Sequence, residues 1–151
     1  MKIGDTVDFT LGDQDGNTVS LSQFRGSPVV LFFYPRADTP GCTVEACEFR
    51  DIYSKLKAAG AVLLGISRDT EKAQKKFATR FSLPYTLLAD PELAVAKQFD
   101  VVRDATMYGK PVIKIERSTF LFDKAGRLQA EFRKVKPEGH AEEILEVVKK
   151  G

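Results

Sequence analysis

The chain has two cysteines, Cys42 and Cys47, which lie five positions apart. Pro40 and Gly41 come directly before Cys42 and mark the start of a helix, so we expect Cys42 in the first helical turn. The unpaired N–H groups and the positive end of the helix dipole at that position favour a thiolate over a thiol. A thiolate can be oxidised, and a nearby second thiol can then form a disulfide with it. The pair therefore predicts redox chemistry.

Other kinds of cysteine site fit the sequence less well. Two cysteines are too few for a disulfide framework, and a four-ligand zinc site is implausible because the one histidine, His140, lies far along the chain. We expect His140 to be an exposed helix residue. Two structural interpretations stay open: Cys42 can be a small core residue, and Cys47, on the apolar face of its helix, can be a structural cysteine.

The predicted elements on either side of Cys42 place it at the edge of a sheet. Residues 29–34 (VVLFFY) are a continuous apolar run rich in β-formers, which predicts a strand buried on both faces at the centre of a mixed sheet. From about residue 42, apolar residues recur at helical spacing up to Gly60, a good helix stop. Reacting groups collect at the carboxyl ends of strands in α/β sheets, so residues 34–47 are the expected site.

The rest of the chain alternates in the same way. The further predictions are a hairpin (9–11 and 18–21), strands (61–66 and 86–88), helices (70–81, 90–99 with Asp90 as N-cap, and one that begins at Pro137), and a second hairpin (118–122 and 128–132). Residues 100–112 match no element. The acidic turn at 13–17 does not continue as a calcium loop, which needs a glycine at position six and a glutamate at position twelve. This order predicts an α/β, thioredoxin-like sandwich with a mixed central sheet and an N-terminal β-hairpin extension, as one domain over residues 1–151.

Composition narrows the partners and the compartment. Lysine and arginine total 23 against 21 acidic residues, so the net charge is +2 and nucleic acid is not an expected partner. No apolar run approaches the length of a membrane span, so a membrane is not expected either. The N-terminus lacks the apolar stretch of a secretory signal, which predicts a cytoplasmic location, or another reducing compartment if a leader was removed.

The residues around Cys42 resemble those of a known family. Pro35-x-x-x-Thr39-x-x-Cys42 matches the active-site motif of the peroxiredoxins at every fixed position. Residues 39–43 (TPGCT) followed by Cys47 resemble the bacterioferritin comigratory protein, or peroxiredoxin Q, subfamily, in which both cysteines belong to one chain. Residues 116–121 (ERSTFL) are similar to the segment that supplies an active-site arginine in that family, here Arg117.

The resemblance implies a role for each of these residues. Cys42 would be the peroxidatic nucleophile and Cys47 the resolving thiol. Arg117 would stabilise the thiolate and the transition state, Thr39 would accept and relay a hydrogen bond, and Pro35 would shield the site from water. Plainer roles stay open: Thr39 can be only the helix N-cap, and Arg117 can be a surface ion-pair arginine.

The implied activity is reduction of hydrogen peroxide or an organic hydroperoxide through a sulfenic acid, with recycling by a thioredoxin-type reductant. No metal, haem or flavin is implied, and the subfamily includes monomers and weak homodimers. Alternatives are a thioredoxin-like disulfide reductase, although that chemistry uses Cys-x-x-Cys, and a non-enzymatic holdase or binding module on the same fold. A glutathione-peroxidase-like site would use a tryptophan, and the chain has none.

Helix geometry adds one structural prediction. Five residues advance about 7.5 Å along a helix and turn about 500°, so two such side chains point about 140° apart. A disulfide needs Cβ atoms about 4 Å apart, so an intact helix cannot contain a Cys42–Cys47 bond. If that bond forms, the first turns of the helix must unwind.

Overall fold

Strand β3 (Val29–Phe33) forms the middle of the molecule because its five residues are all apolar and all buried. A computed structural model describes residues 1–151. In it β3 pairs in parallel with β4 (Val62–Ser67) and antiparallel with β8 (Ser118–Phe122). The predicted central strand of a mixed sheet is confirmed.

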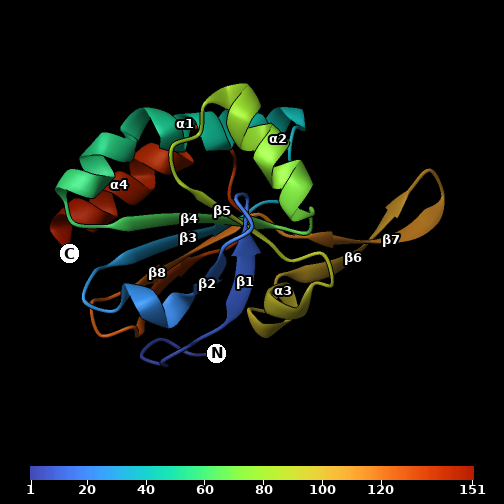
Figure 1. Cartoon of the computed structure of the whole chain (residues 1–151). Coiled ribbons are helices and arrows are strands. Elements are labelled where there is room, and N and C mark those ends of the chain that lie inside the picture. Colours follow the sequence, from blue (N-terminus) through green and yellow to red (C-terminus); the bar gives the residue numbers. More distant parts are fainter.

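The sheet has seven strands in the order β2-β1-β5-β4-β3-β8-β9, and a separate sheet pairs β6 with β7 (Figure 1). The remaining elements, in chain order, are β1 (Thr10–Asp13), β2 (Thr18–Ser20), the 3-10 helix η1 (Leu21–Phe24), α1 (Pro40–Ala58), α2 (Glu71–Phe81), β5 (Thr86–Ala89), α3 (Ala94–Gln98), β6 (Val102–Met107), β7 (Lys110–Ile115), β9 (Leu128–Phe132) and α4 (His140–Lys150). β1 pairs with β5, so the predicted N-terminal hairpin extends one edge of the sheet.

Alternate residues of β3 enter two separate cores. Val30 and Phe32 point to the face covered by α1, α2 and α4, where the ring of Phe32 stacks on Phe49 with centroids 4.6 Å apart. Leu31 and Phe33 point to the other face, which α3 and the N-terminal segment cover (Figure 1). A strand buried on both faces cannot shift its register without burying the wrong set, so its carboxyl end is held firmly.

Two predicted helix starts are wrong. α3 begins at Ala94 and not at Pro91, although the Asp90 carboxylate still accepts hydrogen bonds from the N–H groups of Val95 and Ala96, at 3.3 and 2.8 Å. The cap therefore acts across a turn in which Leu93 has a φ of 63°. α4 begins at His140 and not at Pro137, because Gly139 adopts a φ of 81°.

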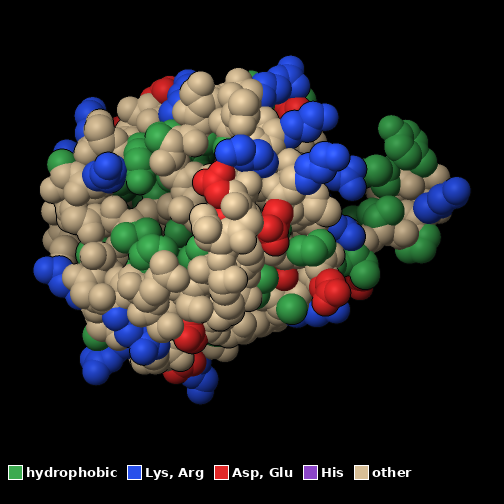
Figure 2. Space-filling model, in the orientation of Figure 1, with side chains coloured by type: hydrophobic (Ala, Val, Ile, Leu, Met, Phe, Trp, Pro, Cys, Tyr) green, Lys and Arg blue, Asp and Glu red, His purple; other side chains and the backbone are tan.

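Most of residues 100–112, for which the sequence predicts no element, belong to the β6–β7 hairpin. It projects from the body of the molecule, and Tyr108 at its tip is 97% exposed (Figures 1 and 2). Because most of its side chains face solvent on both sides, no buried face imposes the alternation that identifies a strand. No helix anywhere in the chain combines the length and the apolarity needed to cross a membrane.

Candidate active site

Cys42 lies in the first turn of α1, as predicted, and is a buried free thiol. Thr39 is the N-cap and Pro40 the first helical residue, and the helical hydrogen bonds begin with Thr43 N–H donating to the Thr39 carbonyl at 2.8 Å. The N–H groups of Gly41 and Cys42 therefore stay outside the helical pattern. They place partial positive charge beside the sulfur, which favours negative charge there.

Arg117 reaches the sulfur from the other side. Its backbone directly precedes β8, where Ser118 pairs with Phe33 at the end of β3. Its Nη2 lies 3.5 Å from Cys42 Sγ, and its Nη1 donates to Glu45 Oε1 at 2.9 Å. The expected arginine is thus beside the expected cysteine, 75 positions away in sequence. The alternative of a surface ion pair is wrong, because its partner Glu45 is fully buried.

Glu45 is a site residue that the sequence interpretation missed. Burial raises its pKa from 4.5 to about 7, while the charge and hydrogen bonds of Arg117 act to lower it. Its second oxygen, Oε2, has no hydrogen-bond partner. Burial would lower the pKa of Arg117, but the charges of Glu45 and Cys42 raise it, so the guanidinium stays charged. The spacing of three residues from Cys42 could have revealed Glu45, since helical residues three apart share a face.

Thr39 occupies the N-cap position without capping through its side chain. Its hydroxyl donates to the carbonyl of Arg36 at 2.8 Å instead. A hydroxyl has one proton and two lone pairs, so the oxygen remains free to accept a hydrogen bond. Pro35 is half-buried and lines, together with Arg117, a hollow that opens beside the site.

The loop that carries Pro35 and Thr39 is held from outside by groups that the sequence did not indicate. Asp69 Oδ2 accepts from the N–H of Ala37 at 2.7 Å and from the hydroxyl of Ser67 at 2.6 Å. Arg80 Nη1 forms an ion pair with Asp38 at 2.8 Å, and Asp38 has a φ of 61°. A left-handed conformation is uncommon for a residue other than glycine, so the loop depends on such contacts to keep its shape.

Cys47 has different surroundings on the same helix. It is half-buried and free, and no side chain donates a hydrogen bond to its sulfur. The backbone beside it is fixed, because Tyr85 donates its hydroxyl proton to the Ala46 carbonyl at 2.7 Å. One turn further, Arg50 Nη1 donates to the Phe81 carbonyl at 2.9 Å. Both cysteines thus belong to one continuous helix whose second turn is tied to its neighbours.

The expectation that His140 is exposed is wrong: its side chain is 2% exposed. Because α4 begins at His140, the ring turns inward between α1 and β8. Its Nε2 lies 2.7 Å from Thr119 Oγ1 and its Nδ1 lies 2.8 Å from Glu143 Oε1. Burial lowers its pKa, so the ring is neutral near pH 7, donates from Nδ1 and accepts at Nε2. It supports the packing behind the site and does not touch Cys42.

Known proteins resemble this chain along most of its length. Residues 3–131 match the AhpC/TSA family. The chain is 47% identical over 137 residues to a putative peroxiredoxin Bcp of Coxiella burnetii, covering 91% of both chains. It is 45% identical over 142 residues to the peroxiredoxin Bcp of Bacillus subtilis, covering 94% of this chain and 90% of the relative.

Solved structures give the same result. A variant of Xylella fastidiosa PrxQ has a TM-score of 0.93 at 36% identity and covers 99% of this chain and 96% of its own. A structure of the Xanthomonas campestris bacterioferritin comigratory protein, concerned with its alkyl peroxide reduction activity, has a TM-score of 0.89 at 37% identity, with 94% and 90% covered.

Proposed function

This chain belongs to the AhpC/TSA family, in its Bcp and peroxiredoxin Q group, and we propose that Cys42 is the thiol with which it attacks a peroxide. The chain is an enzyme, a thiol-dependent peroxidase that acts on peroxides with a thiol reductant. The observation that supports Cys42 is its position: a buried thiol at a helix N-terminus with the Arg117 guanidinium 3.5 Å from its sulfur.

In the first step the Cys42 thiolate attacks the terminal oxygen of the hydroperoxide. An S–O bond forms, the O–O bond breaks, and sulfur loses two electrons to become a sulfenic acid. The remaining oxygen leaves with the electron pair of the O–O bond and takes a proton from solvent, which gives water or an alcohol.

Arg117 acts mainly on the transition state of this step. A lower thiol pKa gives more thiolate but also a weaker nucleophile, so ionisation alone gains little rate. Donors aimed at the oxygens as the O–O bond stretches contribute more: loss of one such donor typically costs about 100- to 1,000-fold. The Arg117 guanidinium and the Cys42 N–H supply donors, and Thr39 Oγ1 accepts a hydrogen bond from the peroxide O–H without taking its proton. Pro35 limits the access of water to the site.

We assign the resolving step to Cys47. Its thiol attacks the Cys42 sulfenic acid, an S–S bond forms, and water leaves. A thioredoxin-type dithiol then reduces the disulfide by two electrons. Since both residues belong to α1, the helix must unwind past the Tyr85–Ala46 contact before the sulfurs meet.

The remaining assignments are that residues 1–151 act as one domain, as a monomer or weak homodimer, in the cytoplasm or another reducing compartment. The two hydrophobic cores pack on one shared sheet, which supports the single domain, and two thiols that must be kept reduced support the reducing compartment.

Two measurements test the function. One equivalent of hydrogen peroxide should remove both free thiols of the reduced protein, and thioredoxin with its reductase should sustain peroxide consumption. A binding module would keep its thiols. A disulfide reductase would reduce a disulfide substrate faster than it consumes peroxide.

Amide exchange tests the unwinding. The disulfide form should lose protection from about Thr39 to Phe49, while β3 and α4 keep theirs. Equal protection in both redox forms, with a chemically mapped Cys42–Cys47 disulfide, would contradict the resolving step as described.

A further inference from the structure

A chain of hydrogen bonds connects the interior of the protein to the loop that carries Thr39. Its members are Ser67 at the end of β4, Asp69 in the segment that follows, and Gln74 in α2. Ser67 and Gln74 are fully buried. Burial of a polar group costs free energy unless the group is hydrogen-bonded, and every buried polar atom of these side chains has a partner. A buried polar network that is fully paired fixes one geometry.

One backbone carbonyl sets the direction of every hydrogen bond in this chain. The Leu88 carbonyl can only accept, so the Gln74 atom that lies 2.7 Å from it is the amide nitrogen. The same nitrogen donates to Ser67 Oγ at 3.0 Å, and Gln74 Oε1 accepts from the Tyr34 hydroxyl. Because Ser67 Oγ accepts from Gln74, its own single proton is free for Asp69 Oδ2, 2.6 Å away. Asp69 is therefore held in place as an acceptor.

Asp69 and Thr39 bind opposite ends of one peptide group. Asp69 Oδ2 accepts from the N–H of Ala37 at 2.7 Å. The carbonyl of the same peptide group belongs to Arg36, and it accepts the hydroxyl proton of Thr39 at 2.8 Å. A peptide group is planar and nearly rigid, so an acceptor that fixes its N–H also fixes the direction of its C=O. The Thr39 hydroxyl thereby keeps its proton on the Arg36 carbonyl, and its lone pairs stay free to accept.

We propose that Asp69 is a positioning residue for the peroxidase reaction and acts on the Thr39 hydroxyl through the Arg36–Ala37 peptide group. The proposal rests on the proposed function, in which Thr39 Oγ1 accepts a hydrogen bond from the peroxide O–H, and it adds the groups that keep this oxygen an acceptor. Ser67 and Gln74 hold Asp69 in place. Without Asp69 the peptide group can turn, the Thr39 hydroxyl loses its fixed acceptor, and its lone pairs no longer point in one direction.

A double-mutant cycle tests whether Asp69 acts through Thr39. Asp69→Ala should lower the second-order rate of Cys42 oxidation by hydrogen peroxide about tenfold, the size expected when one orienting hydrogen bond is lost. In a Thr39→Val background, which has no hydroxyl to orient, the same substitution should change the rate by less than about twofold. Alkylation of Cys42 by iodoacetamide, which reports the thiolate, should also change by less than about twofold in Asp69→Ala.

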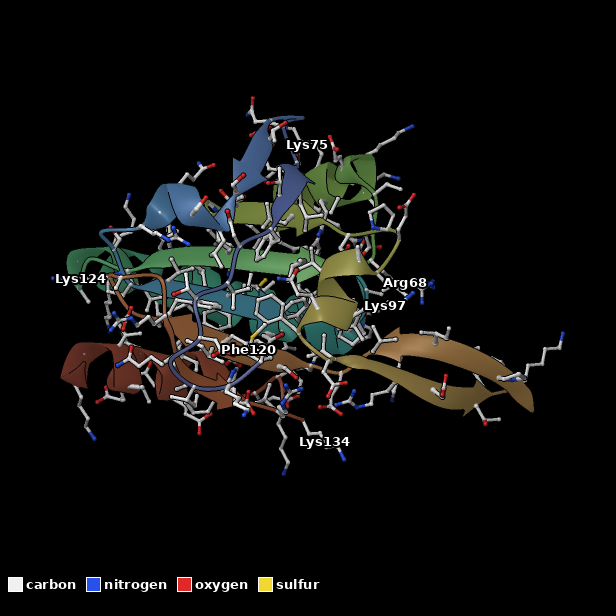
Figure 3. All side chains as sticks on the ribbon, turned by 90° about the horizontal axis from the view of Figure 1, so that it is seen from below. Arg68, Lys75, Lys97, Phe120, Lys124 and Lys134 are labelled. Carbon is white, nitrogen blue, oxygen red and sulfur yellow. The ribbon has the colours of Figure 1, made fainter.

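Two further variants separate the hydrogen bond from a general effect on folding. Both hydrogen bonds to the Asp69 side chain end on one oxygen, and Asp69→Asn keeps one such oxygen, so it should restore most of the rate even if Asp69→Ala folds poorly. Asp15→Ala is the matched control. Asp15 is an exposed carboxylate that pairs at 2.6 Å with Lys75, the neighbour of Gln74 in α2, at an outer edge of the molecule (Figure 3). Its loss should leave the peroxide rate unchanged.

Four results would overturn the proposal. They are an unchanged peroxide rate in Asp69→Ala, an equal loss of rate in the Thr39→Val background, a fall in alkylation as large as the fall in peroxide oxidation, and a rate in Asp69→Asn as low as in Asp69→Ala. The second would show that Asp69 does not act through Thr39, and the third that it acts on the thiolate. If hydrogen peroxide does not oxidise Cys42 in the wild type, the proposed function fails instead.

Discussion

The two cysteines lie five residues apart on α1, and the first and second turns of that helix differ in charge and in anchoring. Around Cys42 the first turn supplies free N–H groups, Arg117 adds its guanidinium, and no side chain forms a hydrogen bond with the backbone of residues 40–43. Around Cys47 the second turn supplies no donor to the sulfur, while Tyr85 fixes its backbone at Ala46. The reactive thiol therefore lies on the turn with the fewer backbone contacts, and the second thiol lies on a turn that Tyr85 anchors.

The largest effect should come from exchanging each thiol for a hydroxyl. Cys42→Ser should abolish peroxide turnover, because an alcohol is not ionised near neutral pH and cannot replace the thiolate. Cys47→Ser should keep the first oxidation but block recycling by thioredoxin, so that sulfenic and further oxidised forms of Cys42 accumulate. Mass spectrometry of the intact protein separates these outcomes. Normal turnover of the Cys47 variant with thioredoxin as the only thiol would show that Cys47 is not the resolving thiol.

Arg117→Ala should have the next largest effect, on Cys42 alone. The second-order rate of Cys42 oxidation should fall by at least about 100-fold, because a donor to the breaking O–O bond is lost. The rate of alkylation by iodoacetamide, which reports the thiolate, should change less. Arg127→Ala, which removes an exposed arginine in the turn before β9, is the control. If the alkylation rate falls as far as the peroxide rate, Arg117 acts only through the thiolate.

Glu45 sets a pH dependence of stability in the first turn. Its pKa is about 7 in the folded protein against an ordinary 4.5, so between these values the folded state holds a proton that the unfolded state has lost. The free energy of unfolding should therefore fall as pH rises from about 4.5 to about 7, by at most about 3 kcal/mol from this group. Glu45→Gln should remove that slope in urea unfolding series, and Glu142→Gln, at an exposed site, should keep it. An unchanged slope in Glu45→Gln would show that Glu45 is ionised throughout.

The smallest effect should come from the second turn. Tyr85→Phe removes the hydrogen bond to the Ala46 carbonyl, which should cost about 1 kcal/mol of stability. If unwinding past Ala46 limits disulfide formation, the same loss should speed the closing of the Cys42–Cys47 bond by about fivefold. Tyr53→Phe is the control, since the Tyr53 ring lies near Tyr85 but its hydroxyl forms no hydrogen bond in the protein. Stopped-flow measurement of thiol loss gives the rate, and slower closing in Tyr85→Phe would contradict the anchoring role.

Local patterns were enough for much of the fold. The apolar run at 29–34, the helical spacing up to Gly60 and the two hairpins were strong because each was imposed by a buried face or a tight turn. The β6–β7 hairpin was not found because it has no buried face to impose a pattern. The starts of α3 and α4 cannot be located from the prolines before them. Leu93 sets the start of α3 and Gly139 that of α4, each in a left-handed conformation.

The chemistry of this protein can be inferred from residue order alone, because Pro35, Thr39, Cys42 and a second cysteine lie within one short segment. The surroundings of the sulfur cannot, because they are built by elements that are far apart in the sequence. Arg117 reaches Cys42 because β8 pairs with β3. The pKa of the Glu45 carboxyl is raised because the packed elements around it exclude water. Asp69 holds the Ala37 backbone, and Tyr85 holds α1, across distances in sequence that no local pattern records. Such contacts depend on which elements pack together, and burial then fixes their strength.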